Sequence, residues 1–364
     1  MTLVHASDLH LCEADAGYGL EVLDELVDLC LEVQAQALLL AGDVFDSFDA
    51  AEALREPFRK RVERLAARCR VLFLPGNHDE QRRGSRRLAA LDLGPVTLLD
   101  RRPFSLVRFP EEGVEVVGVP ERPDYDDFRS WGVPDKAAPV RIVLAHGIVP
   151  GLAYTGPAAA DEDGETAAGR LEPRLFRELA ADYAALGHLH GRRQAVDDGV
   201  TFSYPGSARV WRRGESGEHG VWRLAAGRNG VTGEFVPLRA AGRYRVFDVP
   251  VELAGTVDMA PLQPERWHRN DWVVLRATGV VEDENELAGV LDDLRRRYGG
   301  AVRKLEIDSR GCEAMPGIAT HPQAGRVQEV WEASEPHDTA ERPAWLRARQ
   351  LGLLAIKHEL AEGT

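Results

Sequence analysis

Lysine is nearly absent from this sequence, which has it only at positions 60, 136, 304 and 357. Arginine therefore carries the positive charge, and its guanidinium group is suited to bidentate contacts with phosphate. A coding bias of the source genome explains the same composition equally well. The formal net charge of −14 disfavours a protein that coats nucleic acid without specificity. Local contact with nucleic acid stays open, because a basic patch matters more than the total charge.

Paired cysteines and long apolar runs are also missing. The four cysteines lie far apart and form no C-x-x-C pair, which argues against a thiolate zinc site and a disulfide framework and is typical of a reducing compartment. No stretch approaches the roughly 18 apolar residues of a membrane span. The chain enters its first apolar run, TLVHA, without a basic leader. We therefore expect a cytoplasmic protein with no membrane partner.

From residue 1 to 242 the sequence alternates short apolar runs with amphipathic stretches. The runs ALLLAGD, VLFLPGNHD, VEVVGVP, VRIVLAHG, YAALGHLH and TFSYPGS have the length of strands that are covered on both faces. Several of the segments between them have the apolar spacing of helices. This alternation predicts a layered α/β domain.

The character of the sequence changes after residue 242. DWVVLRATG, ENELAGVLDDLRRRYG and AVRKLEID predict a compact β-α-β unit, which we assign to a small second domain over 243–313. Residues 314–325, AMPGIATHPQAG, are typical of a linker. Residues 326–364 contain two helical patterns.

Polar side chains follow the apolar runs of the first domain where each predicted strand ends. In SDLHL, Asp8 and His10 project to the same side of an extended chain. The others are Asp43 and Asp46 in GDVFD, Asn77, His78 and Asp79 in GNHD, His146 in LAHG, and His188 and His190 in GHLHG. Because ligands bind at the carboxyl ends of the strands in open α/β sheets, we expect these side chains to meet at one edge.

Each motif alone has an ordinary structural reading, as a turn, a hydrogen-bonded loop or a polar strand end. Together they would require five independent coincidences, so we favour a metal site. Aspartate, asparagine and imidazole ligands without a thiolate suit manganese, iron or zinc. Seven candidate ligands exceed what one ion with open positions would use. Two divalent ions that share a bridging carboxylate are therefore predicted, and such a pair hydrolyses phosphoesters.

The order D-x-H, GD-x-x-D, GNHD, H and G-H-x-H resembles that of the calcineurin-like metallophosphoesterases. The form GDVFD, the YPGS that follows GHLH and the appended β-α-β unit further resemble the SbcD-type nucleases, the bacterial counterparts of the Mre-type DNA-repair nuclease. The resemblance covers nearly the whole chain. It implies a two-sheet metallophosphoesterase sandwich flanked by helices, with a small β-α-β capping domain that positions DNA and a C-terminal helix pair.

The resemblance also implies a role for each residue of the motifs. The metal ligands would be Asp8, His10, Asp43 and His190 for the first ion and Asn77, His146 and His188 for the second. Asp43 would bridge the two ions, which we expect to be Mn²⁺. His78 would be a catalytic histidine that protonates the leaving oxygen or stabilises phosphoryl charge. Asp46 and Asp79 would orient a histidine. Cys12 stands where the family usually has glycine, a departure that affects the shape of the loop but no ligand.

Arginines beside these motifs are candidate contacts for a DNA backbone. Arg82, Arg83, Arg86 and Arg87 directly follow GNHD, and Arg209 begins the segment RVWRRG. A solvated helix face explains the first group equally well. If these side chains bind phosphates, affinity for DNA should fall steeply with salt.

The last helical pattern has an apolar stripe. It is formed by Trp345, Leu346, Leu353, Ile356 and Leu360. In the SbcD-like family the C-terminal helices bind the coiled-coil base of an SbcC-type ATPase of the SMC class, and we expect residues 326–364 to bind such a partner. The alternative is that the helices pack back on their own domain. The family also tends to form homodimers through its nuclease domain.

Three functions follow from these features. The resemblance favours a Mn²⁺-dependent DNA nuclease subunit in repair, cytoplasmic and nucleoid-associated, with exonuclease action on duplex ends and endonuclease action on single strands or hairpins. A phosphoesterase acting on small phosphodiesters or phosphoproteins uses the same metals but leaves the residues after 242 without a purpose. A non-catalytic scaffold is disfavoured, because scaffolds of this kind usually lose ligands and none is missing here.

Overall fold

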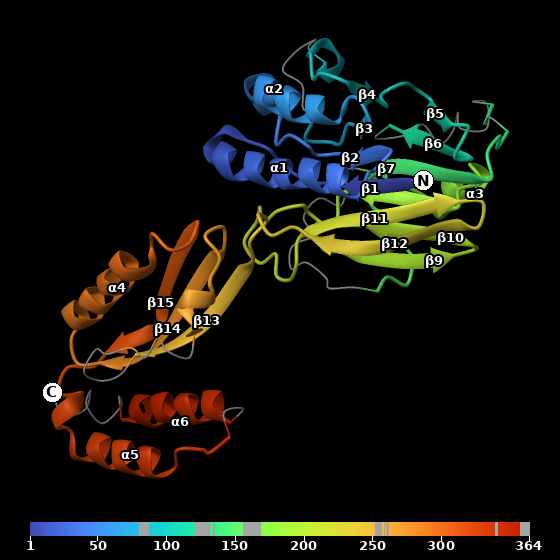
Figure 1. Ribbon diagram of the computed structural model, residues 1–364. Coiled ribbons are helices and arrows are strands. Elements are labelled where there is room, and N and C mark those ends of the chain that lie inside the picture. Colours follow the sequence, from blue (N-terminus) through green and yellow to red (C-terminus); the bar gives the residue numbers. More distant parts are fainter. Residues whose placement is uncertain are drawn as a thin grey trace. The chain divides into compact units, whose positions relative to one another are not determined.

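The computed structural model describes residues 1–79, 87–120, 132–133, 135–155, 169–251, 257, 259, 262–338 and 341–356. The chain divides into two compact units, Met1–Arg243 and Tyr244–Thr364, here called the first and the second unit (Figure 1). No helix in these described ranges is long and apolar enough to cross a membrane.

Two six-stranded sheets build the first unit (Figure 1). The first sheet has the order β12-β11-β1-β2-β3-β4 and the second has the order β5-β6-β7-β8-β10-β9. The strands are β1 (Thr2–Ala6), β2 (Ala37–Ala41), β3 (Arg70–Leu74), β4 (Val96–Leu98), β5 (Ser105–Phe109), β6 (Val114–Val119), β7 (Val140–His146), β8 (Tyr183–Gly187), β9 (Arg193–Asp197), β10 (Val200–Tyr204), β11 (Gly220–Gly227) and β12 (Gly230–Pro237). The strands β1 to β4 run parallel, as do β6, β7, β8 and β10, whereas β11, β12, β5 and β9 pair antiparallel at the margins.

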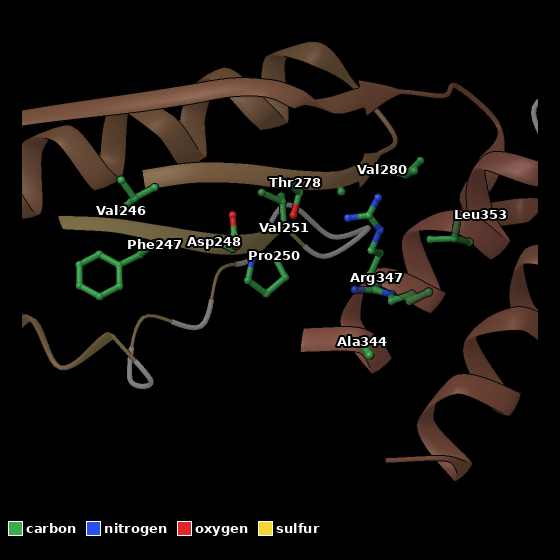
Figure 2. Close-up of a pocket in the computed structure, with 12 residues that line it drawn as sticks. Val246, Phe247, Asp248, Pro250, Val251, Thr278, Val280, Ala344, Arg347 and Leu353 are labelled. Carbon is green, nitrogen blue, oxygen red and sulfur yellow. The ribbon is translucent and has the colours of Figure 1, made fainter. Parts of the chain in front are cut away.

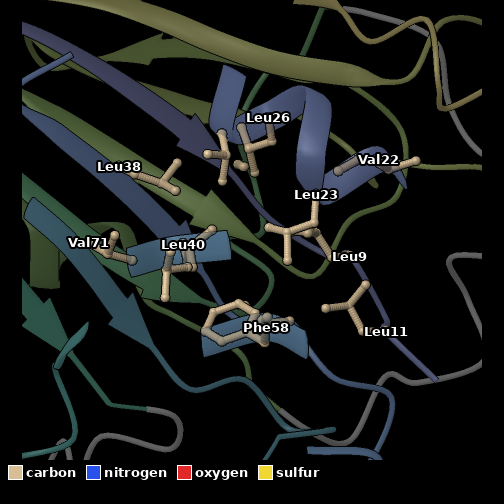
Figure 3. Close-up of a cluster of buried hydrophobic side chains, with 14 of the residues drawn as sticks. Leu9, Leu11, Val22, Leu23, Leu26, Leu38, Leu40, Phe58 and Val71 are labelled. Carbon is tan, nitrogen blue, oxygen red and sulfur yellow. The ribbon is translucent and has the colours of Figure 1, made fainter. Parts of the chain in front are cut away.

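Alternating side chains of the central strands contribute to two separate cores. Leu38 and Leu40 of β2 face the helices α1 (Ala16–Glu32) and α2 (Phe48–Val62), where they pack with Leu23 and Phe58 (Figure 3). Leu39 points to the other face of the same strand and belongs to the core that both sheets share. Burial on both faces explains why these strands are apolar at every position.

The short helix α3 (Pro173–Glu178) covers the outer face of the second sheet. Its Phe176 is fully buried and packs with Val143 of β7 and Phe202 of β10. The ring of Phe176 meets that of Phe202 edge to face, with the centroids 5.1 Å apart. Helices therefore flank both sheets, and the predicted two-sheet sandwich is confirmed.

The second unit contains a sheet of three parallel strands in the order β13-β14-β15. These strands are β13 (Tyr244–Val251), β14 (Trp272–Val281) and β15 (Lys304–Ala314), with α4 (Glu284–Tyr298) between the last two. Leu291 and Leu294 of α4 are buried against the sheet. Asp283 caps this helix by accepting a 2.8 Å hydrogen bond from the backbone N–H of Asn285. The predicted β-α-β unit is present, and β13 adds a third strand to it.

Helices α5 (Pro322–Ala333) and α6 (Arg342–Ala355) close the described chain and pack on the second unit. Leu353 and Ile356 are almost fully buried in one cluster with Val280 of β14. The indoles of Trp331 and Trp345 stack at 3.7 Å, and each indole N–H donates to the other residue's carbonyl oxygen. One face of the helix pair therefore packs on its own unit, as in the alternative to partner binding that the sequence left open.

Residues 314–325 are packed rather than a linker. Met315, Ile318 and Ala324 are at most 4% exposed and share a core with Leu353. Helix α5 already begins at Pro322 within this segment. The linker was predicted because glycine and proline give this segment the composition of a loop. Its few apolar residues instead pack the helix pair against the sheet.

A groove of about 570 Å³ remains between the sheet and α6 (Figure 2). Pro250 of β13, Thr278 of β14 and Ala344 and Arg347 of α6 are among its lining residues. Val246 of the edge strand β13 is 40% exposed. The helix pair thus covers only part of the sheet.

Candidate metal centre

The strand-end motifs of the first unit converge on one site at the carboxyl ends of β1, β2, β3, β7 and β8. Nε2 of His10 lies 3.2 Å from Nε2 of His190, although the two residues are 180 positions apart. Oδ1 of Asn77 lies 3.1 Å from Nε2 of His146 and 3.3 Å from Nδ1 of His188. Parallel order brings together the ends of β1, β2 and β3 in the first sheet and those of β7 and β8 in the second, and the cluster lies where these two sets of ends meet.

Two groups of these side chains have the spacing of metal ligands. They are Asp8, His10 and His190, and Asp43, His146 and His188, with the ligand atoms of each group within 4.8 Å of one another. The first group is buried apart from the partly buried His190, and the second apart from the partly buried His188. A third group with the same spacing shares His10 and adds Asp46 and His78.

The donor set of these groups fits divalent cations. Two imidazole nitrogens that face each other at 3.2 Å have room for at most one proton between them, whereas a cation satisfies both lone pairs. Burial raises the pKa of the Asp8 carboxyl to about 6. The protein alone therefore supplies too little positive charge to stabilise the ionised form of this buried group. Nitrogen and oxygen donors without sulfur suit manganese, iron or zinc.

The second group contains a charged pair. Burial by itself would raise the pKa of Asp43, but Nε2 of His146 lies 3.2 Å from its Oδ2, and this pairing lowers that pKa well below its ordinary value. Burial likewise opposes the charged form of His146, yet Asp43 raises its pKa to about 10. Burial lowers the pKa of His10 to about 4 and that of His188 to about 3. Both imidazoles are therefore neutral at physiological pH, the form that binds metal.

The backbone adopts left-handed conformations at four of the ligands. The φ angles are 54° at Asp8, 44° at His10, 51° at Asp43 and 102° at His188. Such conformations are rare outside glycine and cost roughly 1–3 kcal/mol each where the surrounding structure enforces them. They turn each side chain out of its strand direction and toward the common centre.

Glycine is required next to one of these ligands. Gly42 has φ 86°, and a Cβ atom there would lie 2.2 Å from Nδ1 of His146. That nitrogen instead approaches the carbonyl oxygen of Ala41 at 2.8 Å, where it donates a hydrogen bond. The bond leaves Nε2 of His146, which faces Oδ2 of Asp43 at 3.2 Å, as the atom that would bind an ion in place of its proton.

His78 lies beside the first group without belonging to it or to the second. Its Nδ1 donates to the carbonyl oxygen of Asp46 at 3.0 Å, so Nε2 is the atom left for a substrate. Its ring meets that of His10 edge to face at 4.7 Å. Oδ1 of Asp46 lies 3.5 Å from Nδ1 of His10, so its carboxylate acts on that imidazole through its charge and not through a hydrogen bond.

Asp79 does not orient a histidine as predicted. Its fully buried carboxylate accepts hydrogen bonds from the backbone N–H groups of Val44, Phe45 and Gly76. Asp79 thereby fastens the GNHD loop to the GDVFD loop. Burial and the negative charge of Asp43 raise its pKa to about 8.

The predicted DNA contact at Arg209 is wrong. Arg209 is fully buried, and its guanidinium donates to the carbonyl oxygens of Leu9 and His10 and to the carboxylate of Asp15. Its charge serves to hold the loop that carries the first two ligands. Of the other predicted contacts, Arg87 is exposed, and Arg82, Arg83 and Arg86 lie outside the described residues.

Replacement of Arg209 by methionine should destabilise the first unit. Methionine, the longest apolar side chain, fills most of the space. It leaves two buried carbonyl oxygens and the carboxylate of Asp15 without their hydrogen-bond donor, which lowers the free energy of unfolding by about 3 kcal/mol. Urea unfolding followed by circular dichroism measures this change in the free energy of unfolding. Arg228→Met, in the turn between β11 and β12, is the control with an exposed guanidinium. Equal midpoints for both variants would contradict the clamp at Arg209.

Two residues of the site, Glu215 and Trp211, were missed in the sequence. Oε1 of Glu215 lies 2.5 Å from Nδ1 of His190, which orients that imidazole. The indole of Trp211 stacks on the imidazole of His10 at 3.8 Å, with 4° between the planes. A metal-binding histidine usually donates to a carboxylate, but several acids follow His190 in the sequence and none is singled out there.

Buried aspartate and histidine side chains at the strand ends of both sheets form a candidate metal centre of the kind that metal-dependent hydrolases use. Residues 1–192 match the family model of the calcineurin-like phosphoesterases, which spans more than half of the chain. The chain belongs to the calcineurin-like phosphoesterase family. A comparison with curated proteins gave no match.

Solved structures that this chain partly resembles include two phosphatases and one protein described as an anchor. Purple acid phosphatase PPD1 from yellow lupin (Lupinus luteus) is 14% identical with a TM-score of 0.47, over 67% of this chain and 52% of that chain, so the match spans about half of the lupin protein. A dimetal phosphatase from Danio rerio is 12% identical with a TM-score of 0.41, over 65% and 99%. GAP50, the anchor in the inner membrane complex of Plasmodium, is 11% identical with a TM-score of 0.44, over 66% and 85%.

Proposed function

We propose that this protein is an SbcD-type DNA nuclease that uses two divalent ions, with Mn²⁺ as the native metal, to hydrolyse phosphodiesters at DNA breaks. The observation that carries the proposal is the cluster of seven predicted ligands, all with nitrogen or oxygen donor atoms. His78 lies beside this cluster and outside the two predicted ligand groups. The second unit lies beyond the matched family region, and we propose that it is a capping domain that positions DNA. We place the protein in the cytoplasm with the nucleoid, as a homodimer through its first unit.

The residues of the site divide the work of hydrolysis. Bound divalent ions supply Lewis acidity at phosphorus and a water of lowered pKa. Nε2 of His78 would carry the proton that the leaving oxygen takes, because Nδ1 is engaged by the carbonyl oxygen of Asp46. Glu215 fixes the ring orientation of His190, so this ligand atom does not have to reorganise during the reaction.

The test is an assay of the purified full chain on labelled blunt duplex, hairpin and single-stranded DNA with Mn²⁺, and on bis(4-nitrophenyl) phosphate. We expect cleavage of DNA that is lost in EDTA and restored by excess Mn²⁺. Turnover of the small diester without any cleavage of DNA would replace the proposal by the small-substrate phosphoesterase. No turnover of either substrate would point to a scaffold.

For the partner, we propose that an SbcC-type ATPase binds the outer face of the helix pair α5 and α6. Val330 and Leu351 are 70% and 58% exposed there, whereas Leu353 is buried in the second unit itself. Deleting residues 326–364 would strip the cover from Val280, so point changes are the sharper test.

The double variant Val330→Glu/Leu351→Glu should lose co-elution with the ATPase in size-exclusion chromatography, because two charges would enter an apolar contact. Its cleavage of single-stranded DNA in Mn²⁺ should equal that of the wild type. Val196→Glu is the matched control, since Val196 is 72% exposed on the first unit. Co-elution of the double variant at wild-type strength would remove this face from the partner contact.

A further inference from the structure

One predicted ligand, His10, lacks the hydrogen bond that orients two other imidazoles of the centre. Nδ1 of His146 donates to the carbonyl oxygen of Ala41 at 2.8 Å, and Nδ1 of His190 faces a carboxylate oxygen of Glu215 at 2.5 Å. Nδ1 of His10 is buried and has no hydrogen-bond partner among the described residues. A metal-binding histidine usually has its ring oriented by a bond at the nitrogen that does not bind the ion. Another contact must therefore orient the imidazole of His10.

The indole of Trp211 supplies this contact. It lies on the imidazole of His10 with the centroids 3.8 Å apart and 4° between the planes. Because the two rings are in van der Waals contact over their faces, the imidazole cannot tilt without moving the indole. The rings of His78 and His190 meet the same imidazole at steep angles, with centroid distances of 4.7 and 5.1 Å. Ring contacts thus confine the side chain of His10 where hydrogen bonds do not.

The segment that carries Trp211 is anchored on both sides of it. Before it, the guanidinium of Arg209 donates a hydrogen bond to the carbonyl oxygen of His10 itself. After it, a carboxylate oxygen of Glu215 accepts the backbone N–H of Trp211 at 2.7 Å. Nε2 of His219 lies 3.2 Å from the carbonyl oxygen of Glu215. The segment therefore holds His10 twice, at its backbone through Arg209 and at its ring through Trp211.

The chemistry of this stack favours the metal-bound form of the imidazole. An imidazole that gives a lone pair to a cation loses electron density, and the electron-rich face of an indole attracts such a ring. The indole of Trp211 thus stabilises the metal-bound ring of His10 more than the free ring. By linkage, a stack that strengthens when the ion binds also strengthens the binding of the ion.

We propose that Trp211 is a positioning residue of the metal centre, which takes the place of the missing hydrogen bond at His10 and raises the affinity for one of the two ions. The ion concerned is the divalent cation of the group formed by Asp8, His10 and His190. The proposal rests on the two-metal centre of the proposed function and deepens it.

Isothermal titration calorimetry of the metal-free full chain with Mn²⁺ measures the affinity for each ion. Trp211→Leu should raise one Kd about tenfold, the scale that follows from removing the support of a metal-binding histidine. The other Kd should stay within about twofold of the wild type, because Trp211 does not stack on the second group. Trp211→Phe should keep both values within about threefold, since it retains a ring that stacks.

Two further variants separate the ring from its volume and its place. Trp211→Met should resemble Trp211→Leu, because methionine fills irregular space without an aromatic face. Trp267→Leu is the matched control and should change neither Kd, because the half-buried indole of Trp267 stacks on Phe247 inside the second unit. Far-UV circular dichroism shows that each variant is folded.

The dependence of hydrolysis on Mn²⁺ concentration is the second readout. With bis(4-nitrophenyl) phosphate, Trp211→Leu should need about ten times more Mn²⁺ for its half-maximal rate. Its rate at saturating Mn²⁺ should lie within about twofold of the wild type, because the chemistry is intact once both ions are bound. A much lower rate at saturation would overturn the proposal, since Trp211 would then act after metal binding.

Three outcomes of the calorimetry would also overturn the proposal. They are wild-type Kd values in Trp211→Leu and Trp211→Met, equal losses in Trp211→Phe and Trp211→Leu, and an equal rise of both Kd values, which would show a general disturbance of the centre. Failure of the nuclease function is distinguishable from these. If the wild type binds two ions and hydrolyses only the small diester, the nuclease function fails while the Kd values still decide the role of Trp211. A wild type that binds no Mn²⁺ overturns both.

Discussion

Replacement of Asp43 by asparagine should remove bound Mn²⁺ and lower kcat for phosphodiester hydrolysis by at least about 10⁴-fold. Asp43 is 2% exposed, and its two oxygens have separate tasks. Oδ2 lies 3.2 Å from Nε2 of His146, and Oδ1 accepts the backbone N–H of His78 at 2.9 Å. Asparagine has the same size but no charge, so it cannot neutralise two cations and it leaves His146 without its anion.

Metal content per chain is the first readout, measured by mass spectrometry after dialysis against Mn²⁺ and removal of the excess. We expect about two ions in the wild type and fewer than one in Asp43→Asn. Asp100→Asn is the matched control, because Asp100 is exposed on the same unit. Two tightly bound ions in Asp43→Asn would show that this carboxylate is not a ligand.

Replacement of His78 by alanine should keep both ions and lower kcat on DNA by about 10³-fold, within the range of a lost general acid. The ring of His78 lies edge to face with His10 and outside the two predicted ligand groups. Its Nδ1 bond to the carbonyl oxygen of Asp46 fixes the ring, so Nε2 is aimed without the help of the substrate.

The identity of the leaving group tests this role directly. A nitrophenolate leaves without a proton, so His78→Ala should lose much less activity on bis(4-nitrophenyl) phosphate than on DNA. His337→Ala, with an exposed imidazole in the second unit, should match the wild type on both substrates. Equal losses on the two substrates would assign His78 to electrostatic stabilisation, and a loss of metal would make it a ligand.

The candidate ligands could be singled out in the sequence because each follows the end of an apolar strand. A continuous apolar run such as that of β2 predicts a buried parallel strand, and parallel order brings the ends of neighbouring strands of one sheet together. Asp8 and His190 follow strands of different sheets, so their meeting depends on how the two sheets pack and was implied by the resemblance alone. The same apolar pattern predicted a layered α/β domain, whereas the two-sheet sandwich was implied by the resemblance to the metallophosphoesterases.

The supports of the site could not be predicted, since they depend on how one loop folds over another. Arg209, Trp211 and Glu215 come from the segment after β10, which reaches the first motif through a bridge between Ser7 and Ser207. Nothing in the letters RVWRRGE distinguishes an arginine turned inward to bind carbonyl oxygens from one turned toward solvent. The half-exposed strand β13 was missed for a related reason, because its outward side chains weaken the apolar pattern.

The left-handed backbone at Asp8, His10, Asp43 and His188 bears on how this protein can evolve. A lineage relieved of hydrolysis could release this backbone strain by exchanging any of these residues for glycine, since glycine enters that region without steric penalty. The exchange would also remove side-chain contacts, such as the hydrogen bonds that Asp8 accepts from the backbone N–H of His188. Glycines at these four positions would mark descendants that retain the architecture as a mere framework.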